Sequence, residues 1–274
     1  MNRDDDGPPP ILRTKHPGDR SVFRPENLLR EGRRQLGKSD GAVPRVCLLD
    51  PDGDIVRHLK REGLGQPCGS WACYHTELLE FAWEGAALGV VGFAVDAPFA
   101  VLVGEQLFAS GCELLLSITS AGQIAPVGPT PCFVAIERAL RDEGTSYHYL
   151  PPSDFSEVDG SLLEALKSAF EECAQPVHGG PTWTTDAPYR ETEAAIAAAR
   201  EAGVLAVEME AAALYAFARA SGNPVLCFAH VTNQMAVAEG DFEKGEAGGS
   251  RDALSLAAAV ARRWTEVRSD SRTA

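Results

Sequence analysis

The sequence predicts a single α/β domain with a mostly parallel or mixed sheet. Short, near-continuous runs of Val, Leu and Ile alternate along the chain with stretches of helical periodicity. The length of 274 residues suits one such domain, and 45% of the residues are apolar, which is ordinary for a globular core. Strand and helix in regular alternation favour helices packed around one sheet.

Six apolar runs are typical of buried strands, and we expect them at residues 45–49, 88–95, 113–119, 131–136, 204–207 and 224–231. Six stretches with helical patterns follow at residues 25–36, 98–110, 160–173, 192–202, 209–220 and 251–267. Pro98 suits the first turn of its helix, and Gly111 and Gly222 suit helix ends.

The two ends of the chain carry no periodic pattern. We expect residues 1–24 to form a flexible N-terminal arm, 25–268 to form the domain, and 269–274 to be a disordered tail. The acidic, proline-rich start is unlike a signal peptide. The most apolar region, residues 85–103, is interrupted by Asp96 and Pro98, which predicts two short elements and no membrane span. We therefore expect a soluble, cytoplasmic protein.

The net charge of −14 and a pI near 4.9 argue against nucleic acid and anionic membranes as partners. The six histidines do not pair at ligand spacing with cysteines or carboxylates, so we expect no metal. The cysteines are odd in number and scattered, without a CxxC pair, which indicates small buried side chains in a reducing compartment. They are Cys47, Cys68, Cys73, Cys112, Cys132, Cys173 and Cys227.

Ligands of such sheets bind at the carboxyl ends of strands, so polar residues just past a strand are the first candidates. Glu208 and Glu210 flank Met209 at a predicted strand–helix junction. An ionised carboxylate can accept two hydrogen bonds from a vicinal diol, as on ribose, and a thioether can lie against the sugar face. Acidic residues are also common in a first helical turn for structural reasons alone.

Three further segments carry polar groups near strand ends. In residues 183–192 (WTTDAPYRET), Trp183 and Tyr189 could line a base pocket, or the segment could be a loop with an Asx turn. Residues 117–124 (SITSAGQI) could bind an anion through Thr119, Ser120 and Gly122, or form a plain polar strand exit.

The fourth segment is a predicted strand that ends in His230, Thr232 and Asn233. The amide of Asn233 both donates and accepts hydrogen bonds, so it could read a base edge, although an asparagine after a strand is often a turn residue. His230, inside an apolar run, is more typical of a core histidine than of a catalyst.

Taken together, these segments and residues 142–153 (DEGTSYHYLPPS) resemble, in order and spacing, the nucleoside phosphorylase family of hexameric purine nucleoside phosphorylases, uridine phosphorylases and related nucleosidases. The segment at residues 207–216 (VEMEAAALYA) is the most specific. The resemblance implies a twisted mixed sheet, partly closed as a barrel and flanked by helices. It also implies a homo-oligomer (a dimer or a trimer of dimers) and cleavage through an oxocarbenium-like sugar, with no cofactor beyond inorganic phosphate as a possible co-substrate.

The resemblance also implies roles for individual residues. By position, Glu210 matches the family's ribose carboxylate, Met209 the methionine that packs on the sugar, and Glu208 the neighbouring acidic residue. Tyr189 matches an aromatic position near the base. Asn233 falls where purine-cleaving relatives carry an aspartate that protonates the leaving base. Ser120 matches a Ser/Thr phosphate ligand, so we expect Glu210 and Asn233 to be the catalytic residues.

The chain departs from the family's pattern where phosphate should bind. The family's first-strand loop carries an arginine that grips phosphate, but here Asp50, Asp52 and Asp54 crowd that loop, and Ser117 replaces a second arginine. Charge-assisted hydrogen bonds contribute about 1.5–3 kcal/mol each, so this loss is large. The sequence offers possible substitutes in Arg57, Arg24, Arg30, Arg33 and Arg34.

Two mechanisms therefore stay open. The overall likeness favours phosphorolysis, which gives free base and ribose 1-phosphate. The missing arginines favour attack by water, activated by Asp52 or Asp54. The amide of Asn233 suits a 6-oxopurine base, and uridine is also consistent. A non-catalytic nucleoside-binding protein is a further possibility, because it would explain the lost phosphate ligands. No GxGxxG motif follows a predicted strand, which argues against a dinucleotide-binding oxidoreductase.

Overall fold

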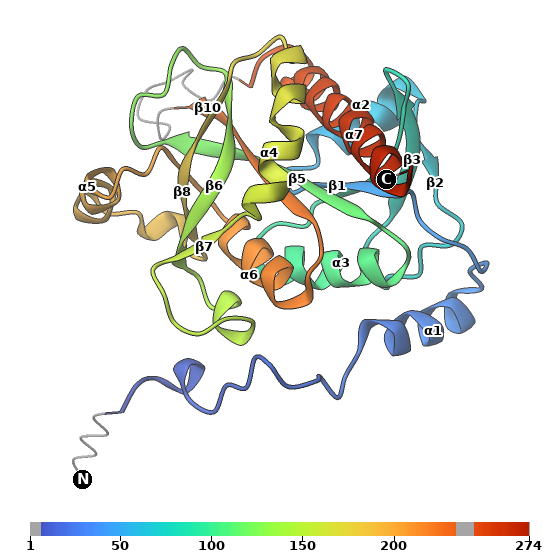
Figure 1. Cartoon of the computed structure of the whole chain (residues 1–274), viewed down its shortest axis with the longest axis horizontal. Helices are drawn as coiled ribbons and strands as arrows, with labels where there is room; N and C mark the ends of the chain where they lie inside the picture. The colour runs from blue at the N-terminus through green and yellow to red at the C-terminus, as the bar shows by residue number, and fades with distance from the viewer. Residues whose placement is uncertain (1–6, 234–243, 274) are drawn as a thin grey trace.

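The computed structural model describes residues 7–233 and 244–273. Ten strands form one mixed sheet, and five of them close on themselves. Around this ring run β10 (Val225–Asn233), β6 (Cys132–Asp142), β8 (Val177–Thr185), β9 (Ala206–Glu208) and β5 (Leu114–Gln123), and β5 pairs with β10 again. The predicted α/β fold with a mixed, partly barrel-like sheet is confirmed (Figure 1).

The remaining strands extend the sheet beyond this ring. β1 (Val46–Asp50) pairs in parallel with β5 and with β4 (Ala86–Gly92). Beyond β4 lie β3 (Leu78–Trp83) and β2 (Gln66–Pro67), both antiparallel to their neighbours. The short β7 (Phe155–Glu157) pairs with β6.

Helices cover both faces of the sheet, because alternate residues of each buried strand point to opposite sides. In β1, Cys47 and Leu49 pack in the cluster that includes α3 (Ala97–Ala109) and α6 (Ala211–Ser221). Val46 and Leu48 pack in the cluster of α2 (Asp54–Glu62), α4 (Gly160–Leu166) and α7 (Ser250–Thr273). Figure 1 shows these two helix groups on either side of the strands.

Two helices lie outside these groups. α1 (Pro25–Leu36) has the bounds that the sequence predicted and packs against α3. α5 (Glu193–Glu201) covers a small third cluster at the β8–β9 end of the sheet. Residues 7–24 run beside the domain as a mostly exposed chain with a 3-10 turn at Pro10–Leu12, and the flexibility expected for this arm stays a prediction.

The structure corrects several sequence-based expectations. α2, β2, β3, β7 and β8 were not predicted, and the helix expected at residues 160–173 is α4 followed by the 3-10 turn Lys167–Glu172. The tail expected to be disordered at residues 269–274 is helical as far as it is described, because α7 continues to Thr273. Ser269 there donates to the Thr265 carbonyl at 2.8 Å, as it would inside a helix.

The cysteines are free thiols, and all but the half-buried Cys173 are buried, as the sequence predicted. In the described part of the chain, no helix is both long enough and apolar enough to cross a membrane. The described residues also contain no group of three or more His, Cys, Asp or Glu side chains placed to hold a metal ion.

Candidate active site

The candidate residues converge at one edge of the sheet because of strand direction. β1, β4, β5 and β10 are linked by parallel pairings, so their carboxyl ends meet at this edge. β9 pairs with the last residues of β5, with Val207 opposite Gly122. This pairing brings the β9–α6 junction, which carries Glu208 and Glu210, to the same edge as Ser120 and Asn233.

Glu208 is held at this junction by four neutral donors. Its Oε1 accepts from the hydroxyls of Thr182 at 3.1 Å and Thr184 at 2.5 Å. Its Oε2 accepts from the amides of Glu210 and Ala211, both at 2.7 Å. The carboxylate thus caps the first turn of α6 and fills its acceptor sites within the protein. These four bonds all lie within the protein, and the ribose contact expected of Glu208 stays a prediction.

Glu210 has a different environment, although it is only two residues away. Its side chain is 1% exposed, and its Oε1 accepts from the Asp96 amide at 2.8 Å. Its Oε2 has no hydrogen-bond partner among the described residues. Burial and the neighbouring Glu208 raise the pKa of Glu210 to about 8, whereas the Asp96 amide and the nearby Thr119 hydroxyl act in the opposite direction. One buried oxygen is therefore available to a ligand.

The residue that holds Glu210 is itself in a strained conformation. Asp96 has φ 78° and ψ 148°, a region that residues other than glycine rarely adopt. Its own carboxylate accepts from the Ala97 amide and caps α3. Burial and the adjacent Asp96 carboxyl raise the pKa of Asp186 to about 6. The loops after β4 and β8 therefore meet beside Glu210, a contact that the sequence did not predict.

Trp183 lies on the face of β8 opposite the one that contacts Glu208. It lies in β8, where its neighbours Thr182 and Thr184 face Glu208, so its own side chain points to the opposite side. There it is 5% exposed, packs in the cluster under α5, and donates its indole N–H to Asp142 at 3.0 Å. The base contact expected of Trp183 stays a prediction, and the burial of its indole under α5 gives that contact no support.

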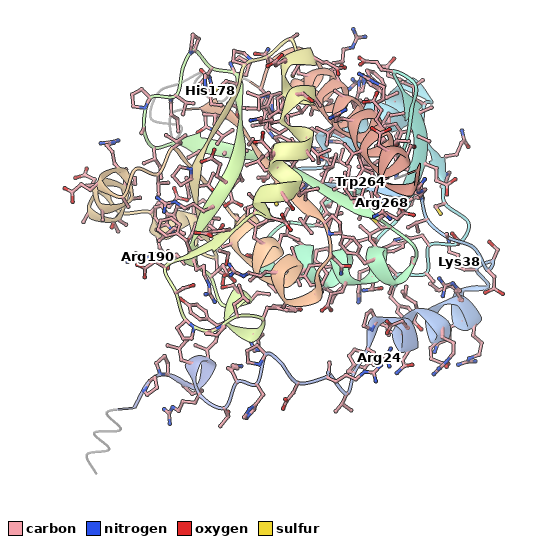
Figure 2. The ribbon with its side chains drawn as sticks, in the orientation of Figure 1. Arg24, Lys38, His178, Arg190, Trp264 and Arg268 are labelled. Atoms are coloured by element: carbon pink, nitrogen blue, oxygen red, sulfur yellow. The ribbon has the colours of Figure 1, made fainter. Side chains whose placement is uncertain are left out.

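Tyr189 lies on the surface of the chain. It lies in the 3-10 turn Pro188–Arg190 with its side chain 99% exposed. Figure 2 shows the next residue, Arg190, at the outer edge of the molecule. The place near the base that is expected of Tyr189 therefore stays a prediction.

The other predicted residues lie at the shared edge. Asn233 ends β10, is buried, and pairs in register with Gly122. Thr119 is buried on β5 beside Glu210, and Met209 is half-buried at the junction. The structure therefore brings Asn233, Gly122, Thr119 and Met209 to one edge with Glu210.

The loop after β1 is a cluster of paired charges. Asp52 Oδ2 accepts from the Ser120 amide at 2.9 Å. The backbone N–H of the residue that was predicted to bind phosphate is therefore already hydrogen-bonded to a carboxylate. The Lys244 ammonium lies 2.6 Å from Asp54 Oδ2 and 3.4 Å from Asp52 Oδ2. Arg57 donates to Asp54 Oδ1 at 2.6 Å and to the Asp52 carbonyl at 2.7 Å. Although burial opposes it, these hydrogen bonds from Lys244 and Arg57 lower the pKa of Asp54.

Asp50, the last residue of β1, is buried under this loop. Its Oδ2 accepts from the Val56 amide at 2.9 Å. Burial, together with the charges of Asp52 and Asp54, raises the pKa of Asp50 to about 7, against the effect of the Val56 amide. A carboxyl group with a pKa near neutrality can take up or release a proton at the pH at which most enzymes work.

The arginines near the arm do not supply the missing phosphate cations within one chain. Arg24 pairs with Glu26, and Arg30 and Arg34 both pair with Glu31. Figure 2 shows Arg24 at the beginning of α1, which packs on the α3 side of the sheet, whereas the β1–α2 loop leads to the other face. Of the suggested substitutes, only Arg57 reaches the loop, and sequence reasoning missed Lys244.

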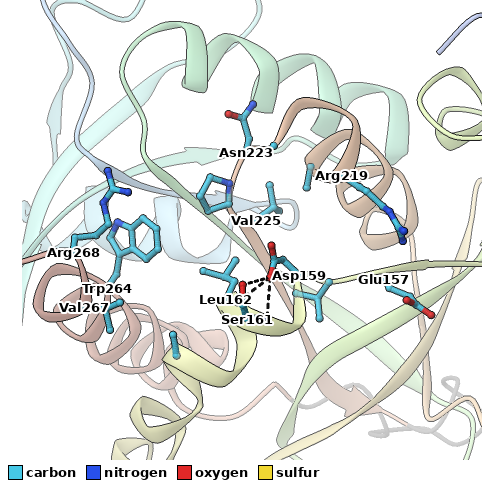
Figure 3. Close-up of a pocket in the computed structure, with 15 residues that line it drawn as sticks. Glu157, Asp159, Ser161, Leu162, Arg219, Asn223, Val225, Trp264, Val267 and Arg268 are labelled. Carbon is cyan, nitrogen blue, oxygen red and sulfur yellow. Dashed lines mark hydrogen bonds between the residues drawn. The ribbon is translucent and has the colours of Figure 1, made fainter. Parts of the chain in front are cut away.

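A small cavity lies at the site, and a larger one lies away from it. A small one of about 20 Å³, room for roughly one water molecule, lies at the strand ends and is lined by residues that include Asp50, Asp52, Asp54, Thr119, Ser120, His230 and Lys244. A cavity of about 540 Å³ lies between α4, α6 and α7, at the amino end of β10 (Figure 3). It is lined by residues such as Arg219, Trp264 and Arg268 and by none of the predicted site residues.

The chain is similar in sequence to several known nucleoside phosphorylases. The guanosine phosphorylase of Halorubrum lacusprofundi is 28% identical over 182 residues, which cover 66% of this chain and 70% of that protein. The uridine phosphorylase of Thermococcus kodakarensis is 28% identical over 240 residues, which cover 80% of this chain and 82% of that protein. A purine nucleoside phosphorylase of the DeoD type from Colwellia psychrerythraea is 28% identical over 159 residues, 57% of this chain and 68% of that protein.

The fold is similar to that of a solved enzyme as well. The crystal structure of uridine phosphorylase from Vibrio fischeri superposes with a TM-score of 0.67 at 18% identity, covering 80% of this chain and 90% of that one. The family model of the phosphorylase superfamily matches residues 53–263, from the last residue of the β1–α2 loop into α7, and this range includes the β9–α6 junction. The chain therefore belongs to the phosphorylase superfamily.

Proposed function

We propose that this protein cleaves the N-glycosidic bond of a nucleoside by phosphorolysis, giving the free base and ribose 1-phosphate. The observation that carries the proposal is the buried Glu210 carboxyl, with one oxygen held by the Asp96 amide and the other without a partner among the described residues. The pKa of Glu210 is raised to about 8, so the free protein holds a proton on this carboxyl at neutral pH. Hydrogen bonds donated by both hydroxyls of a ribose diol would favour the ionised carboxylate.

The sugar site has to hold the ribose in place and to stabilise the positive charge that develops on it. As the glycosidic bond breaks, positive charge develops on the sugar, and the Glu210 carboxylate stabilises it in a site that excludes water. Glu208 acts as a positioning residue, because its hydrogen bonds to the Glu210 and Ala211 amides fix the junction. Met209, half-buried beside them, would pack on the sugar face.

The leaving base would be held from the end of β10. Asn233 is buried there, and its amide can donate a hydrogen bond to N7 or O6 of a 6-oxopurine as electrons move into the base. The names of the relatives span guanosine, purine and uridine phosphorylases, so uridine is the alternative base. We propose no cofactor apart from inorganic phosphate, and we expect a cytoplasmic homo-oligomer.

Hydrolysis is the second candidate, and a specific contact favours it. The Ser120 amide, expected to bind phosphate, donates to Asp52, and the adjacent cavity has room for roughly one water molecule. Asp52 or Asp54 could then remove a proton from that water as it attacks the sugar.

A nucleoside panel separates these candidates. Inosine, guanosine, adenosine, methylthioadenosine and uridine would be incubated with and without phosphate, and free base would be measured. Phosphorolysis predicts release of base and formation of ribose 1-phosphate only with phosphate. Equal release without phosphate would establish hydrolysis. Nucleoside binding without release from any of the five would instead support a non-catalytic binding protein.

A further inference from the structure

The amino end of α7 points toward the same small cavity as the β1–α2 loop. Gly248, Gly249, Ser250 and Lys244 line this cavity together with Asp52, Asp54 and Ser120. Gly249 has φ 74°, and a Cβ there would lie 2.2 Å from the His230 ring, so only glycine allows this close approach. α7 has 24 residues, and the first amides of a long helix favour a negative charge at its amino end.

Two buried polar side chains line this cavity without a hydrogen-bond partner in the described ranges. Ser250 Oγ belongs to a residue that is 1% exposed, and His230 Nε2 to one that is 5% exposed. Most buried polar atoms in proteins are paired, so two orphans in one cavity need an explanation. Burial lowers the pKa of His230 to about 4, so its ring is neutral at pH 7 and keeps one N–H as a donor.

The cavity is lined by donors and by three carboxyl groups, Asp50, Asp52 and Asp54. Asp54 is paired with Lys244 and Arg57, and Asp50 accepts from the Val56 amide, so Asp52 is the carboxylate that contacts the Ser120 amide. The Ser120 amide donates to Asp52 at 2.9 Å, and Lys244 lies 3.4 Å from the same carboxylate. Ser250, His230 and the helix end lie around the same space. Asp52 thus sits where an oxyanion bound to the Ser120 amide would place an oxygen atom.

We propose that Lys244, Ser250 and His230 at the amino end of α7 form an oxyanion site with Ser120, and that inorganic phosphate binds there by displacing the Asp52 carboxylate. This inference rests on the proposed phosphorolysis. It replaces the missing arginines of the β1–α2 loop and of β5 with donors from a distant part of the chain. The cavity holds roughly one water molecule, so phosphate must take the place of Asp52 and cannot be added beside it.

Direct titration of phosphate tests this site without any nucleoside. Isothermal titration calorimetry would compare the wild type with Lys244→Met, Ser250→Ala and Asp52→Asn. The control is Lys60→Met, which removes an exposed lysine on α2 that pairs with Glu77. Losing the ammonium should weaken phosphate binding by about tenfold or more, and losing the hydroxyl by about threefold to tenfold.

Asp52→Asn gives the opposite sign and is the sharper test. Removing the internal competitor should tighten phosphate binding, whereas Lys60→Met should leave it unchanged. Lys244→Arg should restore most of the affinity that Lys244→Met loses, and thermal melting of each variant would show that it is folded. Equal affinity in Lys244→Met and Lys60→Met, or weaker binding in Asp52→Asn, would overturn the proposal.

The same measurements separate this inference from the proposed function. A wild type that cleaves nucleosides but does not bind phosphate would overturn the oxyanion site and support hydrolysis. A wild type that binds phosphate through Lys244 but releases base from none of the nucleosides would overturn the proposed function and support the site.

Discussion

The β9–α6 junction and the β1–α2 loop both gather carboxylates at one edge of the sheet, but they stabilise them differently. At the junction, Glu208 is held by two hydroxyls and two backbone amides, and no cation takes part in these four bonds. In the loop, Asp54 is paired with Lys244 and Arg57, and Asp52 with Lys244 and the Ser120 amide.

This difference indicates what each region can do. Fixed neutral donors keep the junction in one geometry, which suits a site that must hold a sugar in place. Ion pairs that are partly open to solvent contribute little stability and can exchange partners. The loop is therefore suited to admit a second reactant, and the junction to position the first. Four changes would break or sharpen this comparison.

Glu210→Gln should have the largest effect. If Glu210 accepts two charge-assisted hydrogen bonds from the diol, its replacement should lower kcat/KM by about 100-fold or more, because each such bond contributes about 1.5–3 kcal/mol. Steady-state kinetics on the best substrate of the panel would measure this. Glu201→Gln, on the exposed end of α5, is the matched control. Turnover within a few-fold of the wild type in Glu210→Gln would refute the ribose assignment.

Glu208→Gln should act mainly on stability. An amide cannot accept all four hydrogen bonds, so buried donors would lose their partner, and the free energy of unfolding should fall by about 2–4 kcal/mol. Urea denaturation would measure it against Glu210→Gln, for which a smaller loss is expected. If the two variants unfold at the same urea concentration, the two carboxylates do not have separate roles.

The stability of the wild type should fall as the pH rises through the range of Glu210. Its pKa is raised to about 8 in the folded protein, so between about pH 4.5 and 8 the folded state holds a proton that the unfolded state has lost. The contribution is thus present at low pH and is lost as the pH rises. Glu210→Gln removes it, so the melting temperature of the variant relative to the wild type should be higher at pH 8.5 than at pH 5.5. An unchanged difference would argue against the raised pKa.

Trp183→Phe should have the smallest effect. It removes one hydrogen bond to Asp142 and leaves most of the packing under α5, so the free energy of unfolding should fall by about 1 kcal/mol. The KM for nucleoside should stay within about twofold, because the lost hydrogen bond lies on the face of β8 opposite Glu208. Thermal melting and steady-state kinetics would check both values. A large rise in KM would instead indicate that Trp183 contacts the base.

The sequence by itself determined the fold class and one end of the site. Patterns of apolar residues locate β1, β10 and α1, because buried strands and amphipathic helices leave a local signature. Glu210 was a candidate because the strand, the junction and the helix that position it are adjacent in the chain. The barrel-like sheet was expected from the resemblance, because members of one family share a fold.

Only the tertiary structure decided which residues surround the rest of the site. Lys244 is 190 positions from Asp54, and no local pattern can show that they meet. Trp183, expected near the base, lies on the opposite face of β8 from Thr184, which hydrogen-bonds to Glu208, and the face that a residue presents depends on strand register. Glu208 and Glu210 look alike in the sequence but differ in their donors, which come from β8 and from the loop before α3. The chemistry of a buried carboxylate depends on its neighbours in space, and the packing of the sheet chooses those neighbours.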